Sequence, residues 1–340
     1  MPRDRRITSH FTGQRRLWRW LMVASVLVLP ALVHTFKKPT PVPQRTAPLA
    51  TFDLAMQYLA AFRVDDAERV MLEVLASHPE SVRVRDELRW MYFNQFRGQE
   101  LESLLEEGLR VRPHDFSLAV DLLMSEFRPQ NPREALGYWE RAANRQGAQP
   151  KVLATLGYCY ARVGDTERAE QAFQSALDCR PDDALVRIRA AEFSIDRGDW
   201  SSAGQLLNWM DEEGANDSND EVYRGQIWMN QSLVAESQGD IQAALELVER
   251  ALERRSSELR YVQRRGALLQ LLGRSDEAAE CFAFANQLES YVGRLTEIVL
   301  SGDLENPTRE LCYEIAGICE RRGKTLQADT WKRAAMHIGS

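Results

Sequence analysis

The sequence repeats itself every 34 residues, and this period constrains the fold more than any other feature. Seven units fit the count, with seven additional residues between the fifth and sixth units, and a weaker eighth unit follows the seventh after a gap of 16 residues. The units begin at Pro48, Val82, Phe116, Pro150, Ala184, Gly225, Leu259 and Arg309. A fixed period of this length is typical of stacked helix-turn-helix units, which bury their apolar faces only against their neighbours. The period therefore predicts a helical repeat array over residues 48–340.

The unit at residues 150–183 shows the internal pattern most clearly. Apolar and small residues recur at spacings of three and four, which places one set on a face of each of two helices. Between the two sets, Gly164 and Asp165 end the first helix and start the turn. The residues that define the packing are Leu156, Gly157, Tyr160, Ala169, Phe173, Ala176 and Pro181.

These residues resemble the tetratricopeptide repeat, which has Leu-Gly at positions 7 and 8, Tyr at 11, Ala at 20 and 27, an aromatic residue at 24 and Pro at 32. The other units follow the pattern in part, and in the last unit Trp331 falls one position early. The resemblance implies an all-α fold, a right-handed α-solenoid of about eight helix-turn-helix repeats. It also implies a non-enzymatic protein that binds a partner protein or peptide.

A weakly polar to apolar run precedes the repeats. Residues 17–36 form a stretch of 20 residues, about the number that a helix needs to cross a bilayer, and Arg19 and His34 lie near its ends. We expect a basic tail at 1–16 and a transmembrane signal-anchor helix at 17–36. Because six Arg residues precede the unbroken apolar stretch that begins at Trp20, the N-terminus is expected in the cytoplasm and the repeats on the periplasmic or extracytoplasmic side. Lys37 and Lys38, just after the run, weaken this orientation.

Two other interpretations of the same segment stay open. A cleaved signal peptide would leave a secreted protein, although Val33-His34-Thr35 is a poor cleavage site beside the usual Ala-x-Ala. A buried helix is the third interpretation. Residues 37–47 are rich in proline and are expected to form either an extended spacer or a disordered tether.

Charge and residue spacing exclude several classes of function. Residues 1–38 carry a net charge of +7 within a chain of −7, so the remaining residues carry −14. An acidic repeat array argues against nucleic-acid binding, which needs clustered positive charge. The five histidines are scattered without acidic or Cys residues at ligand or triad spacing, and the five cysteines contain no C-x-x-C motif. We therefore expect no catalytic, cofactor or metal site, and buried apolar roles for most cysteines.

The resemblance also implies where a partner would bind. In this family, positions 2, 5, 9, 12 and 13 of each first helix line an inner groove. In the first three units these positions form an aromatic and Met-rich strip that suits an apolar helix or an extended peptide, whereas later units are more polar. The residues carried over by position are Phe52, Met56, Trp90, Phe93, Asn94, Met124, Phe127, Arg128, Tyr158 and Arg162.

Two interpretations of this strip are left open, because the same side chains would also suit packing on the spacer or on neighbouring units. The favoured function is a membrane-anchored scaffold that binds a partner peptide or protein in the groove. The alternative is a self-assembling structural or envelope protein whose repeats stack, which would make the chain a homo-oligomer. The sequence does not identify the partner.

Overall fold

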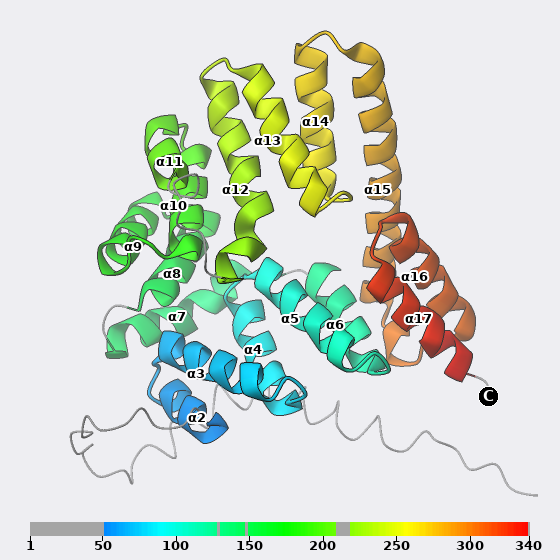
Figure 1. Cartoon of the computed structure of the whole chain (residues 1–340). Helices are drawn as coiled ribbons and strands as arrows, with labels where there is room; N and C mark the ends of the chain where they lie inside the picture. Colours follow the sequence, from blue (N-terminus) through cyan, green and yellow to red (C-terminus); the bar gives the residue numbers. More distant parts are fainter. Residues whose placement is uncertain (1–50, 128–129, 147–148, 209–217, 339–340) are drawn as a thin grey trace, which may run out of the picture. The chain divides into compact units, whose positions relative to one another are not determined.

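The computed structural model describes residues 51–127, 130–146, 149–208 and 218–338, which contain sixteen α-helices and one short 3₁₀ helix. The prediction of an all-α chain built from helix-turn-helix pairs is confirmed (Figure 1). The helices are α2 (Phe52–Ala60), α3 (Val64–Ser77), α4 (Val82–Asn94), α5 (Gly98–Val111), α6 (Phe116–Phe127), α7 (Pro132–Gln146), α8 (Pro150–Val163), α9 (Thr166–Cys179), α10 (Ala184–Asp196), α11 (Trp200–Leu207), α12 (Ser218–Ser237), α13 (Ile241–Arg254), α14 (Leu259–Leu271), α15 (Ser275–Ser301), η3 (Asp303–Glu305), α16 (Arg309–Arg321) and α17 (Thr325–His337).

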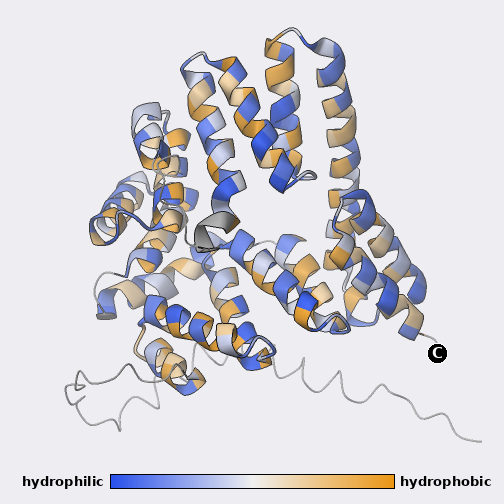
Figure 2. Ribbon diagram, in the orientation of Figure 1, coloured by the Kyte–Doolittle hydropathy of each residue, from blue (hydrophilic) through white to orange (hydrophobic). Residues whose placement is uncertain are grey.

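The helix starts follow the 34-residue count closely. Helices α4, α6, α8, α10, α14 and α16 begin at the first residue of a unit. Three helices depart from the pattern: α2 begins at Phe52, four residues after Pro48, α12 begins seven residues before Gly225, and α15 has 27 residues and exceeds the length of an ordinary second helix. Hydrophobic residues lie along the facing sides of the paired helices, as Figure 2 shows.

The hairpin of α8 and α9 illustrates how the sequence sets the local structure. A Cβ on Gly157 would lie only 2.8 Å from the ring of Phe173, so glycine is what allows the two helices to approach. Gly164 ends α8 with a φ of +87°, a backbone conformation that glycine adopts without strain. The Asp165 side chain then caps α9 by accepting a hydrogen bond from the backbone N–H of Arg168. Gly266 and Phe282 repeat the same close approach between α14 and α15.

The third unit differs from a simple hairpin. Helix α6 packs against α5, α15 and α17, whereas α7 packs against α8. The sequence of α6 explains this position, because it is apolar on more than one face. Leu118 and Leu122 pack into one core with the preceding helices, and Ala119, Val120 and Leu123 pack into another with the C-terminal helices. A helix that is apolar on several faces is buried between neighbours rather than exposed on one side.

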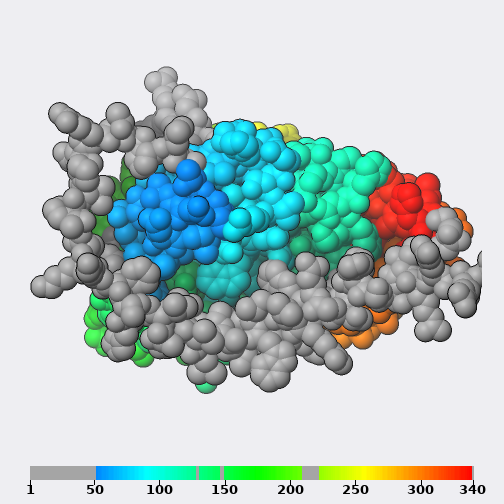
Figure 3. Space-filling model, turned by 90° about the horizontal axis from the view of Figure 1, so that it is seen from below, coloured from blue at the N-terminus to red at the C-terminus, as the bar shows by residue number. Residues whose placement is uncertain are grey.

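The C-terminal helices thus contact the second and third units, far away in sequence. Trp331 of α17 is fully buried and meets the ring of Phe116 of α6 edge to face, with the ring centroids 4.8 Å apart. Seen from below, the surfaces of α2 to α6 and of the C-terminal helix follow one another across one face (Figure 3). The early position of Trp331 in the last unit therefore belongs to a helix that does form, and this tryptophan packs against a distant repeat.

The proposed membrane segment, the basic tail and the proline-rich spacer lie outside the described residues. Among the helices from α2 to α17, none combines the length and the apolar character that a bilayer crossing requires.

Candidate functional site

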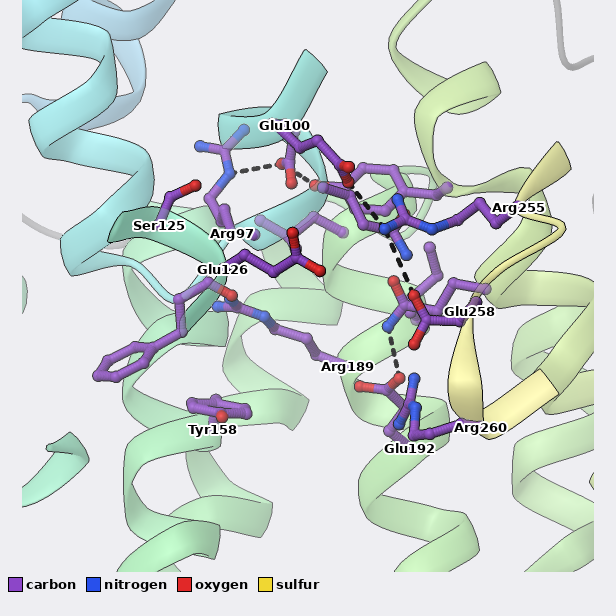
Figure 4. A pocket seen from close by; sticks show the side chains of 18 of the residues that line it. Arg97, Glu100, Ser125, Glu126, Tyr158, Arg189, Glu192, Arg255, Glu258 and Arg260 are labelled. Atoms are coloured by element: carbon purple, nitrogen blue, oxygen red, sulfur yellow. Dashed lines mark hydrogen bonds and ion pairs between the residues drawn. The ribbon is translucent and has the colours of Figure 1, made fainter. Parts of the chain in front are cut away.

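A pocket of about 410 Å³ lies where the start of α5 meets the first helices of the later repeats (Figure 4). We call residues 95–102, which form the turn between α4 and α5 and the first turn of α5, the docked segment. We call the surface that faces it from the later repeats the inner face. The inner face comprises Tyr158 of α8, Leu185, Ile188, Arg189 and Glu192 of α10, Tyr223 and Gln226 of α12, and Arg260 of α14.

The repeat period places most of the inner-face residues. Tyr158 and Glu192 stand at position 9 of their units, and Leu185 and Arg260 stand at position 2. These are positions that the tetratricopeptide pattern assigns to the groove. Because successive first helices pack side by side, α8 against α10 and α10 against α12, equivalent positions come together on one surface.

Arg189 joins the inner face to the docked segment. Its guanidinium group donates hydrogen bonds to the backbone carbonyls of Gln95 and Phe96, the latter at 3.1 Å, and to Thr155 Oγ1 at 3.1 Å. The same guanidinium lies 5.2 Å from the ring centroid of Tyr158, and that ring lies 5.1 Å from the ring of Phe96. Arg189 is almost fully buried, and this burial lowers its pKa. Figure 4 shows its side chain extending across the pocket beside Tyr158.

A buried ion network supports the docked segment from behind. Arg97 bonds Glu68 Oε1 at 2.7 Å and Glu100 Oε1 at 2.6 Å, and Lys151 of α8 bonds Glu68 at 3.1 Å. The hydroxyl of Tyr223 donates a hydrogen bond to Glu100. Burial alone would raise the pKa of Glu68, but its attraction to Arg97 and Lys151 outweighs burial and lowers the pKa to about 2.

A second charged group closes one edge of the pocket, and we call it the charge cluster. Glu102 of α5 pairs with Arg255 at 2.7 Å and with Lys324 at 3.0 Å. Glu126 of α6 pairs with Lys324 at 2.9 Å and with Arg322. Burial would raise the pKa of Glu126, but the two cations outweigh burial and lower it to about 2. The charge cluster therefore connects α5 and α6 to the turns after α13 and α16.

The structure distributes the groove residues that the sequence suggested over three places. Tyr158 lies on the inner face, and Arg162 is exposed on the same helix. Phe52, Met56, Trp90 and Phe93 are half-buried against the core formed by α2 to α10, where the Trp90 and Tyr138 rings meet edge to face. Met124 and Phe127 pack against the core shared with α15, α16 and α17. Asn94 donates a hydrogen bond to the Trp90 carbonyl, and Arg128 lies outside the described residues.

Sequence reasoning missed the charged residues at the centre of this site. Arg97, Glu100 and Arg189 are buried, whereas a charged residue in a repeat is normally expected in solvent. One signal in the sequence could have indicated the burial of Arg189. This residue comes directly before Ala190 and Ala191, two small residues on the packed face of the same helix.

The described part of the chain shows how the potential metal ligands and the thiols are distributed. Within it, no three His, Cys, Asp or Glu side chains come together as metal ligands would. The five cysteines are free; Cys179 is exposed and the other four are buried. Burial raises the pKa of the Cys159 thiol to about 12, which makes it a poor nucleophile at neutral pH.

Comparison with known proteins identifies the repeats. Models of the tetratricopeptide repeat match residues 120–184 and 160–220. One similar solved structure is MamA 41-end from Desulfovibrio magneticus RS-1, which is 20% identical in sequence. The match covers 52% of this chain and 95% of that chain, with a TM-score of 0.40. A tetratricopeptide repeat protein from Parabacteroides merdae ATCC 43184 has 14% identity, coverage of 75% and 92%, and a TM-score of 0.38. Scores this low carry no conclusion about arrangement or function.

The search among curated proteins found no match. The matched residues span the third to fifth units, where α8 and α9 show the close helix packing described above. Residues 120–220 therefore match the tetratricopeptide repeat, a module that in general mediates protein–protein interaction.

Proposed function

We propose that the protein is a non-enzymatic scaffold that holds a peptide or protein partner against the inner face. Residues 17–36 would anchor it in a membrane, residues 37–47 would form the spacer, and the repeats would lie on the extracytoplasmic side. The observation that carries the proposal is the pocket of about 410 Å³ at the inner face, which is lined by aromatic rings and by side chains of both charges.

The composition of the inner face suits a polypeptide ligand. Arg260 supplies an exposed cation at the start of α14, and Glu192 on α10 supplies a hydrogen-bond acceptor. Tyr158 adds a half-buried ring with a polar end. Tyrosine and arginine are enriched among the residues that dominate binding energy in protein interfaces, and such residues cluster around a pocket.

The aromatic strip of the first two units is the second contact area in this proposal. Phe52, Met56, Trp90 and Phe93 are half-buried, so each still presents part of its side chain to a ligand. Met124 and Phe127 contact the chain's own C-terminal helices. For this reason we expect the strip to contribute mainly through α2 and α4.

The test is proximity labelling in living cells with a labelling enzyme fused to the C-terminus of the full chain. The inner-face variant carries Arg260→Glu, at a residue that lines the pocket, and Arg162→Glu, at an exposed groove position four residues after Tyr158 on α8. The matched control carries Arg180→Glu and Arg309→Glu, two other exposed arginines that do not line the pocket. We expect partner labelling by the inner-face variant to fall about tenfold, because the loss of an interfacial arginine weakens the binding free energy by more than about 1 kcal/mol. Identical profiles for wild type and both variants would contradict the proposal.

The anchor is tested separately by alkaline carbonate extraction of membranes. The full chain should stay in the membrane pellet, and deletion of residues 17–36 should move it to the supernatant. Release of the full chain by carbonate would rule out the signal-anchor. Light scattering of the purified repeats tests the self-assembly alternative, since stacking repeats would give a mass that rises with concentration.

A further inference from the structure

The docked segment occupies the inner face through contacts of the kind that a bound peptide makes. The ring of Phe96 lies against the ring of Tyr158, and the carbonyls of Gln95 and Phe96 accept hydrogen bonds from Arg189. Glu100 accepts a hydrogen bond from Tyr223. The segment thus presents an aromatic ring, two turn carbonyls and a carboxylate to three helices of the later repeats.

The backbone of the docked segment is held in a conformation that a free chain avoids. Phe96 has a φ of +58°, in the left-handed region that side chains other than glycine rarely adopt. Such a residue persists only where surrounding contacts hold it. Local hydrogen bonds from the N–H groups of Phe96 and Arg97 to the carbonyls of Phe93 and Tyr92 close the turn at the end of α4, and Arg189 and Tyr158 add contacts from the inner face.

The preceding hairpin repeats the arrangement. Phe62, in the turn between α2 and α3, has a φ of +60°, and its carbonyl accepts a hydrogen bond from the side chain of Gln149. The side-chain amide oxygen of Gln149 in turn accepts a hydrogen bond from the backbone N–H of Asp65. Two successive turns therefore dock on the later repeats through the carbonyl of a phenylalanine in the left-handed conformation. The left-handed residue itself recurs with the repeat, because Gly164, Gly198 and Gly273 hold it at the same turn of later units; what the first two turns share beyond this is the side-chain contact with the later repeats.

We propose that the inner face is a peptide-binding surface that the docked segment occupies as an internal ligand. A partner binds there by presenting the same chemistry, namely an aromatic residue in a tight turn with a carboxylate about four residues later, and it displaces residues 95–102. This inference rests on the proposed scaffold function and specifies its ligand. A competing peptide first makes contact in the pocket beside the docked segment.

The experiment uses the purified full chain and a fluorescein-labelled peptide that copies residues 92–103. Fluorescence anisotropy should show weak binding to wild type, because the inner face is occupied. The variant Phe96→Ala removes the internal ring and should bind the peptide about tenfold more tightly, the effect of weakening one central aromatic contact. Adding Tyr158→Ala to that variant should return binding to the wild-type level. A peptide with alanine in place of the phenylalanine at position 96 is the ligand control.

Two further measurements keep the test independent of how well Phe96→Ala folds. Circular dichroism checks the helical content of each variant, and Glu100→Gln serves as a second, more conservative way to loosen the docked segment. In wild type, hydrogen exchange at residues 97–102 should become faster with saturating peptide. If folded Phe96→Ala and Glu100→Gln bind no more tightly than wild type, or if exchange does not change, the internal ligand is refuted. Partner labelling that still depends on Arg162 and Arg260 would then leave the scaffold function standing.

Discussion

Replacement of Trp331 by alanine should destabilise the protein far more than its place in a weak terminal repeat suggests. The side chain is fully buried, and it packs against Phe116 of α6 and against the core that α6 shares with α15 and α16. Truncation of a buried tryptophan to alanine costs about 3–5 kcal/mol through lost burial and the cavity that remains. Within the described residues the indole N–H has no hydrogen-bond partner. Trp331→Phe removes that unpaired group and should therefore cost much less, about 1 kcal/mol.

Urea denaturation followed by circular dichroism measures both values. Trp200→Ala is the matched control, because that tryptophan is 37% exposed and its loss should change the free energy of unfolding by less than about 0.5 kcal/mol. Hydrogen exchange should show that Trp331→Ala also loosens α6, although α6 lies some 200 residues earlier in the chain. A cost below about 1 kcal/mol for Trp331→Ala, or protection of α6 that does not change, would refute the packing described here.

Two further predictions concern pH and glycine. Because Glu68 and Glu126 have pKa values of about 2 in the folded protein, below the ordinary glutamate value, their stabilising effect is present above the unfolded pKa and is lost as pH falls. Asp65, whose pKa is raised to about 6 by burial, has the opposite effect between about pH 6 and pH 4. The free energy of unfolding, measured by urea titration, should therefore decrease from about pH 4 towards pH 2, and a flat profile in that range would contradict these pKa values. Gly157→Ala should cost about 1–3 kcal/mol by overpacking against Phe173, whereas Gly293→Ala, with open space around it in α15, should stabilise by about 0.5–1 kcal/mol; thermal melts compare the two.

The period of the sequence was sufficient to predict the helical hairpins but not how distant hairpins meet. Spacing within a unit determines which residues face the partner helix, and Gly157 with Phe173 is a case in which sequence and packing correspond directly. The separation of α6 from α7 depends on which of several apolar faces finds a neighbour. Ala119, Val120 and Leu123 fit the usual pattern equally well, so a local pattern cannot indicate that α15 and α17 cover them.

The candidate site was less accessible to sequence reasoning than the fold. Tyr158 was placed in the groove because position 9 of a unit lies there in any regular array. Arg97, Glu100 and Arg189 were missed because a charged residue is normally assumed to face water. Their burial depends on partners such as Glu68 and Tyr223, which lie far away in the sequence. Long-range pairing of charges carries no periodic signal.

The long-range packing of the C-terminal hairpin against α5 and α6, some 200 residues earlier in the chain, is central to this fold. Zero-length carbodiimide cross-linking tests this most directly, because it joins an amine to a carboxylate only in direct contact. Lys324 Nζ lies 2.9 Å from Glu126 and 3.0 Å from Glu102, while the Lys332–Glu320 pair within the last hairpin provides a local control. Mass spectrometry should detect peptides that join Lys324 to Glu126 or Glu102 in the monomeric protein. Recovery of the Lys332–Glu320 link without either long-range link would contradict the account.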